Sequence, residues 1–293
     1  MKHLIVNADD LGADPCRNKG ILEGIKAGVI TSVSVLPNGP ASQEAMEWLQ
    51  RHGRGSVSVG LHLNLSEGRP LSSGLVRLVG SEGCFLGKKA SLRLLSQKED
   101  HSLRKEVAQE LEAQMEWALS WGVPMTHING HQHVHVFPAV VDSLISIAKK
   151  VGIAWVRLPL EEKPIVEMLL EPEVEAEALA FSRAAREASG KIRSFGLRSP
   201  GLFCGLYWKG VLSPRLLDEM LKRLPHGLTE LMVHPGRVET GVRKAPFSGF
   251  SGQQRERELE ALLNPEFRVM LKKYEVILTG FPSGVEPTRS CGS

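Results

Sequence analysis

The sequence contains little cysteine and no closely spaced cysteine pair. Its 293 residues include four cysteines, Cys16, Cys84, Cys204 and Cys291, and no two of them form a C-x-x-C motif. This spacing is unlike a disulfide framework or a zinc ribbon, and it fits reduced thiols in a cytosolic or nuclear protein. We expect three of the thiols to fill the core and the fourth to lie in a tail.

Long apolar runs and charge of one sign are also missing. The opening stretch MKHLIVNADD is too poor in apolar residues for a signal peptide, and no segment approaches the length of a membrane span. The net charge is only +3 with both signs interleaved, so the basic stripe typical of nucleic-acid binding is absent. We therefore expect a cytoplasmic or nuclear protein with no nucleic-acid partner and no membrane partner.

Short apolar runs alternate along the chain with segments of helical periodicity, as in folds that alternate strands with helices. The expected strands are 3–8, 31–38, 56–65, a short strand running into the histidines from 127, then 153–160, 201–207, 228–236 and 275–281. The expected helices are 15–28, 40–53, 102–122, 138–152, 171–190, 214–224 and 253–273. This α/β pattern, without a break in composition, predicts a single (β/α) barrel over 1–282, TIM-like and either regular or irregular.

The periodicity lapses once, after the third strand. Residues 67–102 therefore form a predicted inserted loop, either a functional lid next to a site or a tolerated surface excursion. Residues 283–293 are expected to be a disordered tail.

Polar side chains fall at the carboxyl ends of several predicted strands, where the loops of a parallel α/β fold converge. Asp9 and Asp10 follow the first strand, His62 lies late in the third, Arg157 ends the fifth, and His234 ends the strand before PG. Each also has a plain structural interpretation: an Asp pair can cap a helix or form a turn, a single histidine can belong to the core, and a strand-end arginine can face solvent.

The segment THINGHQHVHVFP holds four of the ten histidines of the chain, His127, His131, His133 and His135. A solvent-facing strand could carry them, but such clusters belong chiefly to metal sites. On an extended segment the last three would face the same way, whereas on a helix the first two would share a face, so spacing alone selects no ligand. Together with carboxylates, imidazoles suit Mg²⁺, Mn²⁺, Zn²⁺ or Co²⁺, and three protein ligands would leave positions for water and substrate.

Six motifs occur in order between residue 4 and about residue 236: VNADDLG, TSVSVLPNG, GLHLNLSEGRPL, THINGHQHVHVFP, VRLPLE and ELMVHPG. In this order they resemble the motifs of the YdjC-like carbohydrate deacetylases, the family that includes the chitooligosaccharide deacetylases. The extended forms LSEGRP and GHQHVHVFP are most similar to the animal members.

The resemblance implies a (β/α) barrel and a Mg²⁺ ion held by one aspartate and two histidines. Matched by motif, these ligands are Asp10, His62 and His131, Asp9 is the proton acceptor, and His234 is the general acid that protonates the leaving amine.

One position departs from the motifs, because many relatives have aspartate where this chain has Asn129. We expect that difference to affect the orientation of His131 rather than the metal itself.

The implied reaction is hydrolysis of the acetamide of N-acetylated amino sugars or chito-oligosaccharides by a metal-activated water. Asp9 would take the proton of the water, and Arg157 would either pair with Asp9 or lie on the surface. Phe203, Tyr207 and Trp208 would stack on a sugar ring or pack in the core.

Other functions remain open at this point. They are a catalytically silent sugar-binding protein on the same fold and a different metal-dependent amidohydrolase; a phosphatase is disfavoured because no cradle for a phosphoryl group is evident. Analogy with related barrels suggests a homodimer.

Overall fold

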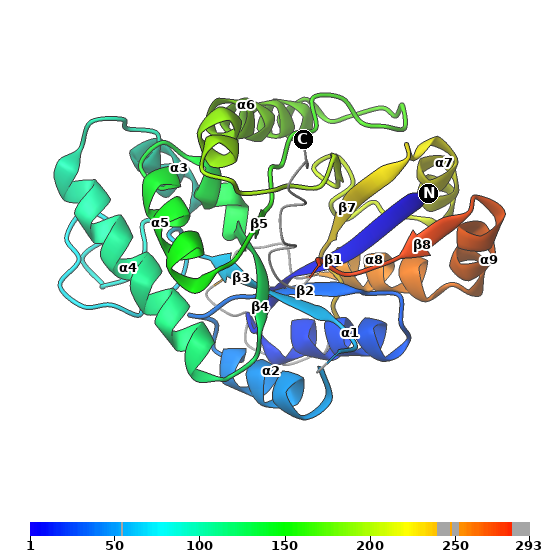
Figure 1. Ribbon diagram of the computed structural model, residues 1–293, viewed down its shortest axis with the longest axis horizontal. Helices are drawn as coiled ribbons and strands as arrows, with labels where there is room; N and C mark the ends of the chain where they lie inside the picture. Colours follow the sequence, from blue (N-terminus) through cyan, green and yellow to red (C-terminus); the bar gives the residue numbers. More distant parts are fainter. Residues whose placement is uncertain (54, 239–246, 248–251, 283–293) are drawn as a thin grey trace, which may run out of the picture.

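The centre of the protein is a parallel sheet curled into half a barrel (Figure 1). This computed structural model describes residues 1–53, 55–238, 247 and 252–282. The strands are β1 (Lys2–Leu11), β2 (Ser32–Val35), β3 (Ser58–Leu63), β4 (Met125–Gly130), β5 (Trp155–Val156), β6 (Leu202–Cys204), β7 (Gly227–Val233) and β8 (Val276–Leu278). They lie in the order β5-β4-β3-β2-β1-β7-β6, and β8 pairs with β1. The predicted α/β fold with a parallel sheet is confirmed.

The sheet does not close into a complete TIM barrel. In the described part of the chain, β5 and β6 do not pair, and only an isolated bridge from Trp155 to Arg198 lies between them. Pro159 follows β5 and Pro200 precedes β6, and proline cannot donate a hydrogen bond to a neighbouring strand. Of the two forms that the periodicity allowed, the irregular one is therefore correct.

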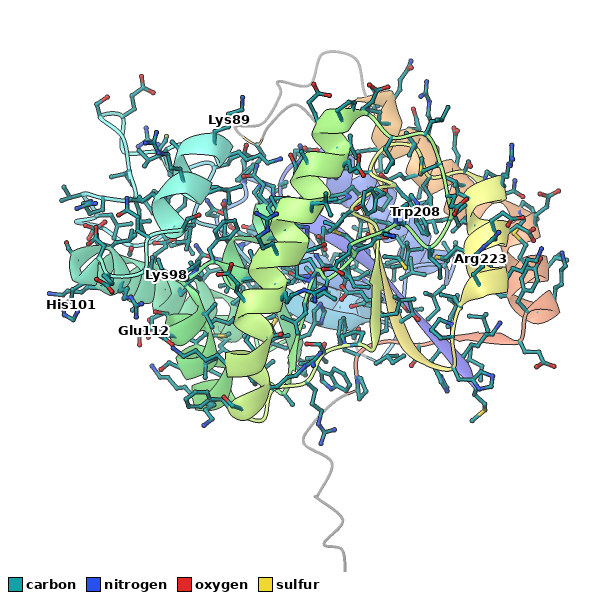
Figure 2. All side chains as sticks on the ribbon, turned by 90° about the horizontal axis from the view of Figure 1, so that it is seen from above. Lys89, Lys98, His101, Glu112, Trp208 and Arg223 are labelled. Carbon is teal, nitrogen blue, oxygen red and sulfur yellow. The ribbon has the colours of Figure 1, made fainter. Side chains whose placement is uncertain are left out.

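Helices cover the outer face of the curled sheet (Figure 1). They are α1 (Pro15–Lys26), α2 (Ser42–Trp48), α3 (Lys88–Leu95), α4 (His101–Ser120), α5 (Val141–Val151), α6 (Pro172–Ser194), α7 (Pro214–Arg223), α8 (Gln253–Leu263) and α9 (Pro265–Lys273). Figure 2 looks onto α6, which runs across the near side of the molecule, and shows His101 and Glu112 pointing outward from α4. The buried face is apolar, and Leu4, Val6 and Ala8 of the central strand are fully buried.

Three predicted segments differ in kind from what the structure has. The single helix expected over 253–273 is two helices, because the Asn264 side chain caps a new start at Pro265. The helix expected over 40–53 is α2 followed by a wider π-helical turn, Leu49–Gly53. The inserted segment 67–102 is not only loop, since it contains α3 and the first residues of α4.

Cys204 is buried, whereas Cys16 and Cys84 are half-buried. The expectation of three core thiols is therefore correct for one of them. Cys291 and the predicted tail lie outside the described residues. Among the residues that the structure describes, no helix combines the length and the apolar character needed to span a membrane.

Candidate active site

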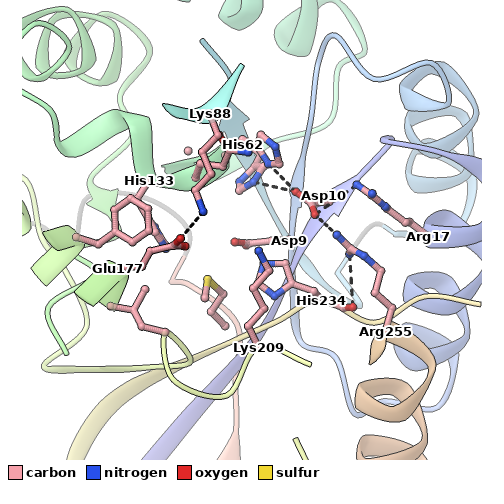
Figure 3. Close-up of a pocket in the computed structure, with 16 residues that line it drawn as sticks. Asp9, Asp10, Arg17, His62, Lys88, His133, Glu177, Lys209, His234 and Arg255 are labelled. Atoms are coloured by element: carbon pink, nitrogen blue, oxygen red, sulfur yellow. Dashed lines mark hydrogen bonds and ion pairs between the residues drawn. The ribbon is translucent and has the colours of Figure 1, made fainter. Parts of the chain in front are cut away.

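Asp10, His62 and His131 converge at the carboxyl ends of three strands (Figure 3). Asp10 Oδ1 lies 2.9 Å from His131 Nδ1 and 3.3 Å from His62 Nε2. One candidate ligand atom from each residue lies within 4.8 Å of the others, and all three side chains are buried. One carboxylate with two imidazoles is a donor set that fits a divalent cation.

The ring orientation of His62 suits this role. Asn129 Nδ2 donates to Ser34 Oγ at 2.7 Å, and Asn129 Oδ1 lies 2.7 Å from His62 Nδ1. Because an amide oxygen only accepts, His62 donates from Nδ1, and this bond turns Nε2 toward Asp10. The expectation that Asn129 acts on His131 is therefore wrong, since its hydrogen bond is to His62.

The partner of His131 is Glu67, which our sequence analysis missed. Glu67 Oε2 lies 2.9 Å from His131 Nε2, so the imidazole sits between two carboxylates. Burial lowers the pKa of His131, but Asp10 and Glu67 outweigh burial and raise it. Glu67 belongs to the LSEGRP motif directly after the strand that carries His62. This position could have indicated that Glu67 lies at the site.

The second oxygen of Asp10 faces two arginines. Arg255 on α8 donates to Asp10 Oδ2 from Nη2, and Arg17 on α1 lies 3.6 Å from the same oxygen (Figure 3). Burial alone would raise the pKa of Asp10, but Arg255 and His131 hold it well below its usual range. Asp10 therefore presents Oδ1 to the imidazoles and Oδ2 to the guanidinium groups.

Asp9 pairs with Arg157, which is fully buried. The two groups form two hydrogen bonds, of 2.6 Å to Asp9 Oδ2 and 2.8 Å to Asp9 Oδ1, and Arg157 Nε also donates to Glu230 Oε1 at 2.8 Å. Burial opposes ionisation of Asp9, but Arg157 brings its pKa below the ordinary value. The surface alternative for Arg157 is wrong. So is the capping alternative for the Asp pair, because the cap of α1 is Asp14.

The other three histidines of the cluster contact different groups. After His127 in β4 the chain forms a kinked 3₁₀ segment, His131–Val136, with Gln132 and His133 in the left-handed region, so the extended arrangement does not occur. His127 Nε2 lies 3.1 Å from Ser34 Oγ, and His135 Nε2 lies 3.0 Å from the carbonyl oxygen of Arg157. Burial lowers the pKa of all three, to about 3 for His135. His133 alone of these three lines the pocket, with its ring against Phe181.

His234 follows β7 and lines the same pocket as Asp9 and Asp10 (Figure 3). Its peptide N–H donates to Glu258 Oε2 at 2.6 Å. Burial, and then the nearby Lys209, lower the pKa of His234 well below 6.5, so its ring is neutral at neutral pH.

An ion pair crosses the mouth of the pocket. Lys88 Nζ, on the α3 helix of the insertion, lies 2.6 Å from Glu177 Oε2 on α6, and both residues line the pocket (Figure 3). The insertion therefore borders the site, and its action as a lid stays a prediction. Neither residue could be predicted from the sequence, because charged side chains on helices usually face solvent.

The three aromatic residues proposed for sugar stacking belong to the core. Phe203, Tyr207 and Trp208 are all buried, and none of them lines the pocket (Figure 2 labels Trp208). Of the two interpretations, packing is the correct one. The aromatic ring in the pocket wall is that of Phe181.

Comparison with known proteins matches residues 3–273 to the model of the YdjC-like protein family. A human protein named carbohydrate deacetylase is 39% identical over 284 residues, covering 92% of this chain and 86% of that protein. One of the same name from Clostridium beijerinckii is 27% identical, covering 95% of this chain and 98% of that protein.

A crystal structure from Enterococcus faecalis, of a protein named for a proposed cellobiose-phosphate cleavage, has the same fold. Its TM-score is 0.74 at 24% identity, with 96% of this chain and 97% of that chain covered. The order of motifs, the convergence of their polar residues and these matches lead to one conclusion: the chain belongs to the YdjC-like family, together with the carbohydrate deacetylases.

Proposed function

We propose that the protein is a metal-dependent hydrolase that removes acetyl groups from N-acetylated amino sugars or chito-oligosaccharides. The observation that carries this proposal is the pairing of two different acids in one pocket. Asp10 faces two imidazoles, as a metal ligand would, and the adjacent Asp9 is held ionised by Arg157. Membership of the family of carbohydrate deacetylases supports the choice of substrate.

Asp10, His62 and His131 would hold the metal, for which we propose Mg²⁺, with Zn²⁺, Mn²⁺ and Co²⁺ as alternatives that the same donors accept. A bound divalent cation would polarise the acetyl carbonyl and lower the pKa of water. Glu67 and Asn129 would fix the two imidazole rings through their remaining nitrogens.

Asp9 would accept the proton of the attacking water. Arg157 keeps Asp9 ionised throughout the physiological range, and it also makes Asp9 a weak base. Proton transfer to Asp9 therefore depends on water whose own pKa has been lowered.

His234 would deliver a proton to the nitrogen of the departing amine as the C–N bond breaks. Because His234 starts neutral, that proton has to reach the ring during the reaction, and Asp9, which gains one from water, is a source in the same pocket. The second proton of the water leaves with the products, which are acetate and the protonated amino sugar, and no net proton stays on Asp9 or His234.

The test is acetate release from acetylated chito-oligosaccharides by protein stripped with a chelator and then reloaded with each of the four metals. We expect acetate release to return with at least one metal and to reach a plateau as the concentration of that metal rises. Binding of the sugar without acetate release under every metal would instead identify a silent sugar-binding protein.

A further inference from the structure

Glu258 on α8 is a buried acid whose two oxygens hold two separate segments of backbone. It is 1% exposed, Oε2 accepts the N–H of His234 at 2.6 Å, and Oε1 accepts the N–H of Gly210 at 2.7 Å. These two hydrogen bonds and the nearby charges of Arg255 and Lys209 favour its ionised form. Burying such a group is costly, and burial raises the pKa of Glu258 to about 7.

The two segments that meet at Glu258 both belong to the pocket. His234 is the candidate proton donor, and Gly210 ends the segment 205–210, which follows β6 and places Leu206 and Lys209 in the pocket wall. In Figure 3 Lys209 and His234 project into the pocket from the same side.

A second buried acid holds the opposite end of the same segment. Glu161 Oε2 accepts the N–H of Gly205 at 2.9 Å and that of Leu206 at 2.7 Å. Burial raises the pKa of Glu161 to about 8. The segment 205–210 is therefore fixed at both ends, but only Glu258 also contacts His234.

The two N–H donors, rather than burial, account for an acid at position 258. A glutamine of the same shape would avoid burial of a charge, but its amide nitrogen cannot accept an N–H. Among side chains of this length, only a carboxylate offers two acceptor oxygens. Two N–H donors from distant segments need both of them.

We propose that Glu258 is a positioning residue that sets the distance between His234 and the segment carrying Lys209, so that both meet the same substrate. This inference rests on the proposed function of His234, and it adds Lys209 as a group that contacts the sugar. Glu258 itself touches neither substrate nor metal; it acts through the backbone of the residues that do.

The test compares Glu258→Gln with Glu161→Gln in the full-length protein. We expect Glu258→Gln to lose one of its two hydrogen bonds and to lower kcat at least about tenfold, the effect of losing one charged hydrogen bond. The ring signals of His234 in labelled-histidine NMR, assigned with His234→Gln, should shift or split. Glu161→Gln should change KM, through Leu206 and Lys209, and leave the His234 signals in place.

An unchanged kcat together with unchanged His234 signals in Glu258→Gln would overturn the proposal. An equal shift of the His234 signals in Glu161→Gln would also overturn it. Such a shift would show that loss of either acid disturbs the whole pocket. The NMR arm does not depend on turnover, so it still tests the positioning role if the wild type releases no acetate. If Glu258→Gln does not fold, Glu258→Asp takes its place: the shorter carboxylate cannot reach both N–H groups, and the same shift is expected.

Discussion

Asp9 and Asp10 are consecutive residues, yet their carboxylates bind different arginines, Arg157 and Arg255. The backbone explains the divergence, because Asp10 has a φ of 66°, in the left-handed region that non-glycine residues seldom adopt. At this point the pairing of β1 with β2 also loses its regular register. One acid can therefore face the imidazoles while its neighbour is held by Arg157.

Because the two carboxylates have different partners, replacing each aspartate by asparagine should have a different effect. Asp10→Asn weakens a direct ligand, so metal content and deacetylation should fall together. Asp9→Asn should keep the metal but lose roughly 10²–10⁴ in rate, the usual contribution of a general base. Elemental analysis and acetate release on the same preparations measure both, and a metal-loaded Asp9→Asn protein of nearly normal rate would remove Asp9 from the mechanism.

The histidine cluster predicts a division into ligands and non-ligands. His62→Ala and His131→Ala should each lose most of the bound metal after dialysis, whereas His133→Ala should retain it, because its ring packs against Phe181. His135→Ala should retain it too, since its ring contacts the Arg157 carbonyl. If His131→Ala kept one metal per protein and His133→Ala lost it, the ligand would be His133 rather than His131.

Glu67→Gln should weaken metal binding without changing the ligands. The variant can still hydrogen-bond to His131, but it lacks the charge that strengthens the imidazole as a donor, so affinity should fall about 10- to 100-fold. Calorimetric titration with the metal measures this. Glu177→Gln, at the mouth of the same pocket, is the matched control and should bind as the wild type does. Equal affinities in all three proteins would show that Glu67 does not act on the metal site.

Glu161 should make the protein less stable as the pH rises. Its folded pKa of about 8 lies above the ordinary value of 4.5, so its contribution to stability is complete below pH 4.5 and is lost as the pH rises toward about 8. Replacement by glutamine removes this loss, so the melting temperature of Glu161→Gln relative to wild type should increase from pH 5 to pH 8. A difference that stays constant over that range would mean that Glu161 is ionised throughout.

The sequence was informative wherever function follows the ends of strands. In a parallel sheet the carboxyl ends share one edge, so the positions of Asp9, His62, Arg157 and His234 in four predicted strands were enough to expect a common pocket. The pocket contains three of them, and Arg157 lies directly behind Asp9. Their catalytic roles stay predictions.

The arginines and acids that come from helices could not be predicted. Arg17, Arg255 and Glu258 lie in charged helices whose pattern is that of a solvent-facing surface, and only tertiary packing brings them to Asp10 and His234. The gap between β5 and β6 could not be predicted either, because periodicity identifies strands and does not say which of them pair.

The order in which a ribosome makes these residues separates the candidate ligands from charged groups that come later in the chain and complete the pocket. Asp10, His62 and His131 all emerge within the first half of the chain, whereas Arg157, Glu230 and Arg255 come later. Until α8 has been synthesised, Asp10 Oδ2 lacks the hydrogen bond from Arg255 and faces only Arg17, 3.6 Å away, so burying its charge would be less favourable. The pocket can therefore reach its final form only near the end of translation, and a nascent chain stalled before α8 should remain open at this site.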